Sequence, residues 1–256
     1  MKLGWKRSSG PLGIEPLTRT GNLVKLAAAT PIDQHIIPEH IPVYNQLSLS
    51  SCAANAGAGM WGILRGLEDK NANLLLSRLF LYWNSRLVTK DTGKDEGTYI
   101  HNIMSSLNNM GVCLESAWEY DVSNVFTQPP ILAYKQGDDN TFNNFYQIMS
   151  SDSERLLDIE MAIKANHPVI FGTNVGSELV NYAGDGKVLG PTSKSIGGHA
   201  MLIVGVRRNP GLEFYIRNSW GPSWGENGHV WFNSDYITDN STSDIFIGTR
   251  MQGLLL

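Results

Sequence analysis

The chain has 256 residues, of which 42% are hydrophobic and 17% are charged, a composition typical of an ordinary soluble globular protein. Its 20 basic and 24 acidic residues give a formal charge of −4, and the basic residues form no cluster, so nucleic acid is not an expected partner. No apolar run approaches the ~20 residues that a membrane span needs, so no contact with a membrane is expected.

Residues 1–42 are predicted to form an N-terminal arm rather than a domain. Prolines recur through this segment with glycines between them, which predicts extended or irregular backbone. Trp5, Ile14, Leu17 and Leu23 are spaced among the prolines. Because an extended chain is the shape that a peptide-binding cleft accepts, we expect part of residues 1–30 to pack across or beside a cleft. The alternative is a disordered or externally docked tail.

Residues 43–130 are predicted to form a helical lobe. From Cys52 onward the apolar residues keep helical spacing, and alanines and glycines give this helix a slim profile. Two further helical patterns follow at 74–87 and 98–110, and Gly111 stands where a C-terminal cap belongs. The stretch from 121 to 140 has the composition of a linker.

Residues 131–256 are predicted to form a β-rich lobe. Short β-type runs recur there and are interrupted by one helical pattern at 152–165. The runs cover residues 143–149, 169–173, 199–206, 212–217, 228–232 and 244–250. The prediction is therefore one α+β domain of two lobes, with a binding cleft between them.

Cys52 lies where a polar loop meets the first predicted helix. A helix N-terminus carries unsatisfied N–H donors and about half a positive charge, and both favour a thiolate over a thiol. We therefore expect a lowered pKa for Cys52 and a role as nucleophile. Cys113 is flanked by apolar residues and is expected to be part of the core.

A nucleophilic thiolate needs a base, a group that orients the base, and donors aimed at the developing oxyanion. His199 is the candidate base, because the preceding Gly198 lets a substrate backbone approach the imidazole closely. Asn218 is the candidate orienting group. Gln46, in the loop before Cys52, is the candidate oxyanion donor.

These residues and their surroundings resemble the papain-like cysteine peptidases, especially the bacterial branch of that family. The resemblance covers roughly residues 30–250 and follows the family order Gln, Cys, His, Asn. Its most specific stretch runs from Asn218 to Gly228. Leu47 and Ser50 stand where the family usually has glycines.

The resemblance implies a papain-like fold, with a helical lobe and an antiparallel β-barrel-like lobe on either side of the active-site cleft. It implies that Asn218 fixes the tautomer of His199 and that Trp220 shields that hydrogen bond from water. Trp224 would line the leaving-group side. The backbone of Gly97 and Thr98 would pair with the substrate at the second position before the cut.

The resemblance also implies a mechanism, which is peptide-bond hydrolysis through a thiolate–imidazolium pair and a thioester acyl-enzyme. The backbone N–H of Cys52 and the side-chain amide of Gln46 would hold the oxyanion. Two alternatives stay open at this point: a related Cys-His acyltransferase or amidase, and a catalytically impaired papain-like binding protein. The expected partner is a peptide or protein substrate.

No cofactor or metal is expected. The six histidines and two cysteines show no zinc-like spacing. Residues 57–62 match the pattern G-x-G-x-x-G, but they lie inside a predicted helix, which favours close packing over nucleotide binding. Two cysteines form no disulfide framework if Cys52 stays free, and the N-terminus lacks a convincing signal peptide. These features predict a bacterial cytoplasmic protein or an exported effector, with the arm as a candidate pro-segment.

Overall fold

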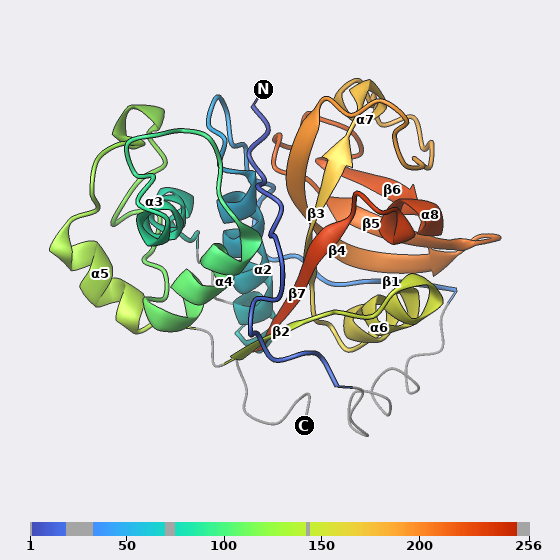
Figure 1. Cartoon of the computed structure of the whole chain (residues 1–256), viewed down its shortest axis with the longest axis horizontal. Coiled ribbons are helices and arrows are strands. Elements are labelled where there is room, and N and C mark those ends of the chain that lie inside the picture. The colour runs from blue at the N-terminus through green and yellow to red at the C-terminus, as the bar shows by residue number, and fades with distance from the viewer. Residues whose placement is uncertain (1, 19–32, 70–74, 142–143, 250–256) are drawn as a thin grey trace.

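The computed structural model describes residues 2–18, 33–69, 75–141 and 144–249. A helical lobe and a sheet lobe lie side by side, and the N-terminal segment runs between them (Figure 1). The helices are α2 (Cys52–Glu68), α3 (Arg78–Val88), α4 (Ile100–Asn109), α5 (Ile131–Asp138), α6 (Asp152–Lys164), α7 (Ser177–Val180) and α8 (Ser234–Thr238), with a 3₁₀ turn at Val122–Asn124. The strands are β1 (Gln34–Ile36), β2 (Asn144–Gln147), β3 (Val169–Val175), β4 (Gly197–Arg208), β5 (Leu212–Arg217), β6 (His229–Asn233) and β7 (Ser243–Thr249).

The helical lobe is built from α2, α3 and α4, which pack against one another. Almost every residue of α2 is buried, because its small side chains let the helix lie between the other helices and strand β4. The G-x-G-x-x-G pattern lies within α2, as expected. Helix α3 begins at Arg78 because the Ser77 hydroxyl caps it by accepting a hydrogen bond from the Phe80 N–H. The predicted start at residue 74 lies outside the described residues.

The strands form one antiparallel sheet in the order β2-β7-β3-β4-β5-β6, with β1 paired to β4. All six predicted β runs are confirmed as strands. Strand β1 pairs Gln34 with Arg207 and belongs to the sheet lobe, although its three residues among prolines are too few to show a period. The helical pattern at 152–165 is confirmed as α6.

Helix α5 was not predicted, because it falls within the stretch that has the composition of a linker. Its large apolar residues, Ile131 and Leu132, are 75% and 73% exposed, and its buried face consists of the small residues Ala133 and Gly137. Pro130 precedes the helix at a position where its missing N–H costs nothing. Periodicity therefore gave no signal for this helix.

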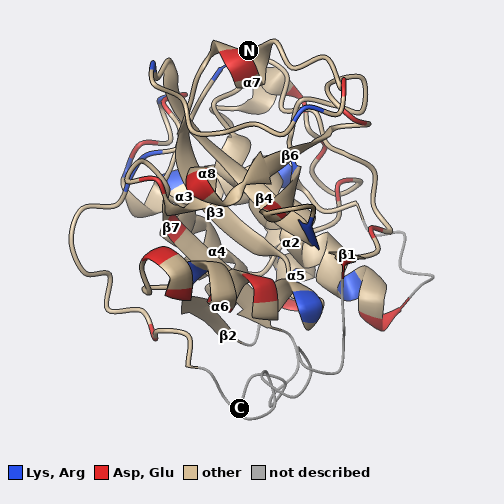
Figure 2. Cartoon of the chain, turned by 90° about the vertical axis from the view of Figure 1, so that its right-hand side faces the viewer, with Lys and Arg blue, Asp and Glu red and all other residues tan. Residues whose placement is uncertain are grey.

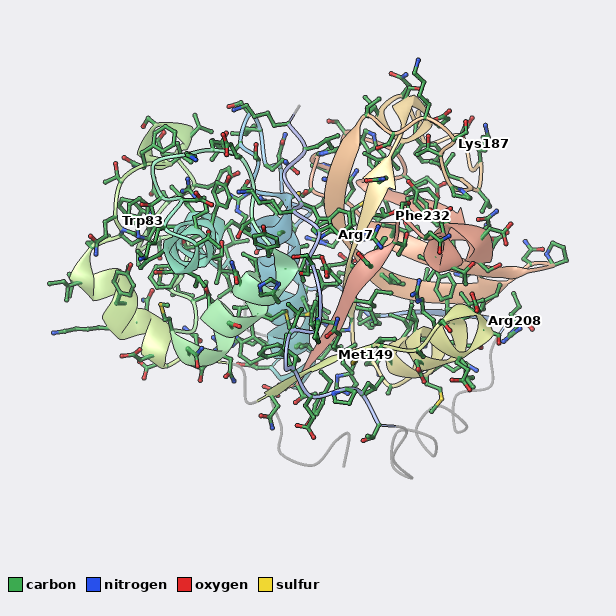
Figure 3. All side chains as sticks on the ribbon, viewed as in Figure 1. Arg7, Trp83, Met149, Lys187, Arg208 and Phe232 are labelled. Atoms are coloured by element: carbon green, nitrogen blue, oxygen red, sulfur yellow. The ribbon has the colours of Figure 1, made fainter. Side chains whose placement is uncertain are left out.

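The apolar cores of the two lobes are continuous. One cluster of buried side chains includes Trp61 and Phe80 from the helical lobe and Phe171 and Phe246 from the sheet. In Figure 3, side chains crowd the space between the ribbons, whereas Arg208 projects from the edge of the sheet lobe. A cleft between the lobes can therefore exist only over part of their boundary.

The N-terminal segment follows the boundary of the two lobes (Figure 1). Near its far end, the Leu17 N–H donates to the Gln147 carbonyl at 2.8 Å, and the Gln147 N–H donates to Glu15 at 3.0 Å. These two bonds attach the segment to strand β2. Residues 19–30 of the predicted arm lie outside the described residues.

Acidic and basic residues are interspersed on the side of the molecule that faces the viewer in Figure 2. Among the described residues, the helices fall short of the length and apolarity that crossing a bilayer requires. The same residues contain no group of three or more histidine, cysteine, aspartate or glutamate side chains arranged for a metal ion.

Candidate active site

Cys52 is the first residue of α2, and its side chain is completely buried. The residues before it, 45–51, form a loop that we call the oxyanion loop, because it carries Gln46. This loop and α2 belong to the helical lobe. The predicted nucleophile therefore stands at a helix N-terminus, as the sequence indicated.

His199 and Asn218 lie on neighbouring strands of the sheet lobe. His199 belongs to β4, Asn218 follows the end of β5, and the pairing of these strands brings the two side chains together. The Nε2 atom of His199 lies 2.8 Å from the Asn218 Oδ1 atom. That oxygen also accepts from the Ser219 N–H at 2.8 Å, so it is an acceptor and the Nε2 atom must be the donor.

This tautomer leaves the Nδ1 atom of His199 as the proton acceptor. Nδ1 is buried and has no hydrogen-bond partner. Trp220 stacks on the imidazole with ring centroids 4.8 Å apart, and Trp224 meets Trp220 edge-on at 5.1 Å. The His199 ring is thus oriented by Asn218 and covered by Trp220, with Nδ1 left to accept a proton.

Cys52 and His199 are both neutral at pH 7 in this conformation. Burial raises the pKa of Cys52 to about 11, and backbone hydrogen bonds from Ala200 and Gly4 oppose that rise only in part. Burial likewise lowers the pKa of His199 to about 4, against a smaller opposing effect of Asn218. This differs from the lowered cysteine pKa expected from the sequence, because complete burial outweighs the helix N-terminus.

Gln46 is completely buried and hydrogen-bonded through every polar group. Its Oε1 atom accepts from the Ser219 hydroxyl at 2.7 Å. Its Nε2 atom donates to the Leu49 carbonyl and to the Lys2 carbonyl, both at 2.9 Å. The amide that was predicted to hold an oxyanion therefore already holds a carbonyl oxygen from the N-terminal segment.

Residues 2–6 pass between the predicted substrate-binding backbones of the two lobes. The Thr98 N–H donates to the Gly4 carbonyl at 2.9 Å, and the Thr98 carbonyl accepts from the Lys6 N–H at 3.0 Å. On the other side, the Trp5 N–H donates to the Gly198 carbonyl at 3.2 Å. The segment therefore pairs with the backbone of both lobes, and its bridge to Thr98 is parallel.

The fit of Gly4 leaves no room for a side chain. A Cβ atom at this position would lie 2.0 Å from the Ser50 carbonyl oxygen in the oxyanion loop. On the facing side, Gly97 has φ +84°, and its N–H donates to the Tyr82 hydroxyl at 3.1 Å. The N-terminal segment therefore runs past Cys52, and at Gly4 the gap has room only for a glycine.

The side chain of Trp5 fills a pocket in the sheet lobe. Its indole N–H donates to Asp244 Oδ2 at 2.9 Å, and a Cβ at Gly172 would lie 2.1 Å from the indole ring. Asp244 also accepts from the Ser8 N–H at 3.0 Å. Trp5 is consequently 8% exposed and acts as the anchor of the segment.

Leu47 and Ser50, which stand where the family usually has glycines, are both accommodated. Leu47 adopts φ +52°, a conformation that favours glycine, and its side chain is 52% exposed. Ser50 donates from its N–H to Asp95 Oδ1 at 2.9 Å and from its hydroxyl to the Asp95 carbonyl at 3.0 Å. Asp95 therefore fixes the loop where the family usually has a glycine.

Sequence reasoning missed several residues that organise the site. Asp95 binds Ser50 and forms an ion pair with Lys2 at 2.7 Å, and Ser219 links Gln46 to Asn218. Ser219 lies inside the most specific motif, directly after Asn218, so its position near the site could have been predicted from the sequence. Asp95 and Asp244 gave no signal, since each meets its partners only through the tertiary fold.

Cys113, the second cysteine of the chain, lies in the apolar core. Cys113 is completely buried, and burial raises its pKa to about 11, as expected of a core residue. A surface pocket of about 490 Å³ opens on the helical lobe beside Arg78 and Tyr120. In the cleft itself, residues 2–6 occupy the space next to Cys52.

Comparison with known proteins gives a consistent result. The sequence profile described as papain family cysteine protease matches residues 38–245. The uncharacterized peptidase C1-like protein L477 of Acanthamoeba polyphaga mimivirus is 31% identical over 220 residues, covering 82% of this chain and 70% of that protein. Fruit bromelain of Ananas comosus is 34% identical over 133 residues, covering 47% of this chain and 36% of its own length.

Solved structures share the fold. Xylellain, a cysteine protease from Xylella fastidiosa, has a TM-score of 0.85 at 24% identity, covering 98% of this chain and 96% of its own. Digestive procathepsin L 3 of Tenebrio molitor has a TM-score of 0.71 at 18% identity, covering 92% of this chain and 73% of its own.

Proposed function

Because the chain belongs to the papain family of cysteine proteases, we propose that it hydrolyses peptide bonds with Cys52 as nucleophile and His199 as base. We further propose that residues 2–6 hold the enzyme in a latent state. The first proposal rests on the arrangement of Cys52, His199 and Asn218, and the second rests on the occupied cleft.

The single observation that carries the latent-state proposal is the position of the Lys2 carbonyl. It accepts from the Gln46 side-chain amide at 2.9 Å, beside the nucleophile. A substrate carbonyl must reach the same amide for its oxygen to be stabilised as the negative charge develops. The N-terminal segment and a substrate therefore compete for one site.

Displacement of the segment would change the charge state of the pair. Water or substrate would then reach Cys52, and the burial that raises its pKa would be reduced. The Nδ1 atom of His199 has a free lone pair, so it can take the thiol proton and leave a thiolate at the N-terminus of α2.

The chemistry then follows in balanced steps. The Cys52 thiolate adds to the scissile carbonyl carbon, and the displaced electron pair rests on the oxygen held by Gln46 and the Cys52 N–H. His199 returns its proton to the leaving amine as the thioester forms. Water then loses a proton to His199 and adds to the thioester carbonyl, and breaking of the C–S bond releases the carboxylic acid and restores the Cys52 thiolate beside protonated His199.

The segment runs against the direction expected of a substrate. In a substrate, the residue that pairs with Gly97 and Thr98 would precede the residue whose carbonyl is attacked. Here Gly4 and Lys6 pair with Thr98, and both come after Lys2 in the sequence. This reversal accounts for a segment that blocks the cleft without presenting its own peptide bond for cleavage.

The acyltransferase or amidase remains the second candidate, and no contact of the described residues favours it over hydrolysis. Product linked to an added amine would identify it. The binding-protein alternative is weakened by the intact set of Cys52, His199, Asn218 and Gln46.

The test compares full-length proteins on one small peptide substrate. Gly4→Val should expel the segment, because its side chain would collide with the Ser50 carbonyl oxygen. We expect kcat/KM to rise by about tenfold or more, because the competent fraction of the enzyme increases. Gly93→Val is the matched control, since a Cβ there has nothing within 4 Å.

Cys52→Ser in the Gly4→Val protein should abolish hydrolysis. Equal rates for the native chain, Gly4→Val and Gly93→Val would remove the latent-state proposal. Hydrolysis that survives Cys52→Ser would remove the proposed nucleophile.

A further inference from the structure

The oxyanion loop must hold two donors at one point. The Gln46 side-chain amide stands at its start, and the Cys52 backbone N–H follows directly after its end. Both must aim at the same oxygen for either to stabilise it. Local preference does not secure this geometry, because Leu47 holds φ +52°, in the left-handed region that a residue with a Cβ atom rarely adopts.

The Tyr120 hydroxyl lies between the two ends of this loop. It donates to the Gln46 backbone carbonyl at 2.9 Å, and it also bonds the Ser51 hydroxyl. The Gln46 side-chain amide is one oxyanion donor. The other is the N–H of the peptide bond between Ser51 and Cys52, and the carbonyl of that peptide bond belongs to Ser51. A single side chain thus fixes the residues that flank both donors.

The directions of these bonds are consistent along the chain of contacts. Because the one Tyr120 proton goes to Gln46, Ser51 donates its own proton to Tyr120. Ser51 Oγ in turn accepts from Asn55 Nδ2 at 3.0 Å, and Asn55 Oδ1 accepts from Arg78 at 3.4 Å. Burial raises the pKa of Tyr120, so its hydroxyl keeps its proton throughout the neutral range.

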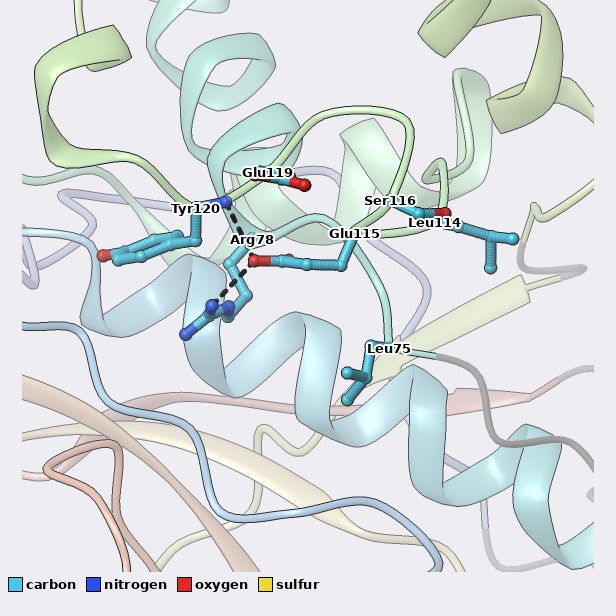
Figure 4. Close-up of a pocket in the computed structure, with 7 residues that line it drawn as sticks. All are labelled: Leu75, Arg78, Leu114, Glu115, Ser116, Glu119 and Tyr120. Carbon is cyan, nitrogen blue, oxygen red and sulfur yellow. Dashed lines mark hydrogen bonds and ion pairs between the residues drawn. The ribbon is translucent and has the colours of Figure 1, made fainter.

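Tyr120 is itself immobilised from both sides, as Figure 4 shows. Its backbone N–H donates to Glu115 at 2.9 Å, and Glu115 pairs with Arg78 at 2.8 Å. The Arg78 guanidinium lies 3.9 Å from the centre of the Tyr120 ring and 4.6 Å from that of Tyr44. A cation over an aromatic face adds attraction to the ion pair.

Arg78 also reaches the loop directly, donating to the Asn45 carbonyl at 3.2 Å. The group Arg78, Glu115 and Tyr120 therefore contacts the oxyanion loop at its start through Asn45 and Gln46, and at its end through Ser51. None of the three contacts the thiol or the imidazole.

We propose that Tyr120, held by Arg78 and Glu115, is a positioning residue that aligns the Gln46 amide and the Cys52 N–H for oxyanion binding. The inference rests on the proposed function. It assigns to Tyr120 an effect on the transition state, where the oxyanion exists, and none on the reactivity of the thiol.

The experiment uses full-length proteins that carry Gly4→Val, so that the cleft is open. Tyr120→Phe removes the hydroxyl and keeps the ring over Arg78. We expect kcat for a peptide substrate to fall about tenfold, because one displaced oxyanion donor accounts for ~10²–10³ when lost completely. We expect KM and the rate of Cys52 alkylation by iodoacetamide to stay within about twofold. Neither substrate binding nor alkylation of the thiol places negative charge on a carbonyl oxygen.

Tyr134→Phe is the matched control. It removes a hydroxyl of the same lobe that donates to Asn84 Oδ1 at 3.0 Å, away from the oxyanion loop. It should lower thermal stability as much as Tyr120→Phe and leave kcat unchanged. An unchanged kcat in Tyr120→Phe overturns the inference. So does a parallel fall of kcat and alkylation rate, which would place the effect on the thiol.

Amide hydrogen exchange provides a readout that does not depend on activity. In the full chain without Gly4→Val, Tyr120→Phe should speed exchange of the Leu49 N–H, which donates to the Gln46 carbonyl at 3.2 Å. Unchanged exchange overturns the inference. A Gly4→Val parent that hydrolyses no peptide removes the proposed function instead, and leaves hydrogen exchange to decide the role of Tyr120.

Discussion

The two sides of the proposed catalytic centre are organised by different means. On the base side, paired strands place His199 and Asn218, and the backbone ladder of β4 and β5 determines their separation. On the nucleophile side, a loop places Gln46, and side chains from distant parts of the sequence hold that loop. The first arrangement is fixed by backbone pairing and the second by tertiary contacts.

This difference implies a difference in tolerance. A ladder of strands keeps its register through single substitutions, because many backbone bonds share the constraint. The oxyanion loop depends on a few individual contacts, from Asp95, Tyr120 and Ser219, and one residue in it is held at a positive φ. Substitutions on the base side should therefore act on chemistry, and those around the loop should act on geometry.

The largest effect is expected for the base itself. His199→Ala in the Gly4→Val protein should lower kcat about 10³-fold or more, because no other group takes the thiol proton. Steady-state kinetics on a peptide substrate measure it. His35→Ala is the control, since His35 Nε2 makes a similar bond to Asn166 Oδ1 at 3.0 Å on the remote strand β1. A comparable fall in the control would make the loss structural.

The next effect concerns stability and pH. Burial lowers the pKa of His199 to about 4 from an ordinary 6.5, so the unfolded chain binds more protons between these values. Stability should therefore fall as pH drops through that window, by about 3 kcal/mol from this residue. Urea unfolding at several pH values measures it, and His199→Gln should flatten the slope. An equal slope in both proteins would contradict the account.

The stability that Asp95 contributes on the loop side should be lost only at a lower pH than the stability that neutral His199 contributes. Burial alone would raise the pKa of Asp95, but hydrogen bonds from Lys2, the Ser50 N–H and Tyr82 lower it overall from 3.8. The stability contributed by ionised Asp95 is present above pH 3.8 and is lost as pH falls through the lowered pKa. Acid should thus weaken the base side first. His167, whose pKa burial also lowers, adds the same slope to both proteins in this comparison.

A smaller effect is expected for Asn218→Ala. The variant removes the partner of His199 Nε2 and keeps the base, so kcat should fall about tenfold, less than for His199→Ala. Asn166→Ala, which removes the matching partner of His35, should leave kcat unchanged. A loss as large as that of His199→Ala would mean that Asn218 does more than orient the ring.

The smallest effect is expected at Leu47. Leu47→Gly relieves the positive φ and should raise the free energy of unfolding by about 0.5–1 kcal/mol, with kcat unchanged. Leu47→Ala is the control, because it removes most of the same side chain and keeps the backbone cost. Urea unfolding that ranks Ala at or above Gly would show that the loop is not strained there.

The sequence predicted the two-lobed fold, and it predicted that His199, Asn218 and Trp220 come together, because they lie in continuous motifs that strands carry into place. The catalytic roles of these residues and of Cys52 and Gln46 stay predictions. It did not predict Asp95, Tyr120 or Asp244, because these residues meet their partners across long stretches of chain. Their contacts depend on how the lobes pack, which no local pattern contains.

The charge state of the centre was also beyond local reasoning. The helix N-terminus predicted a low pKa for Cys52, whereas complete burial raises it to about 11. The proline pattern predicted an extended arm near a cleft, and residues 2–6 lie in it. What the pattern could not predict was that Gly4 and the Lys2 carbonyl would stand beside the nucleophile and change its titration.

The rate of Cys52 alkylation by iodoacetamide as a function of pH tests the central claim most directly. In the native full chain, Cys52 should react slowly at pH 7, no faster than Cys113, whose pKa burial also raises to about 11. In Gly4→Val, alkylation of Cys52 should be much faster at pH 7, with its apparent pKa lowered by the exposed helix terminus and His199. Mass spectrometry separates the two cysteines. Equal rates and equal pH profiles for Cys52 in the two proteins would contradict the claim that the N-terminal segment holds the catalytic pair neutral.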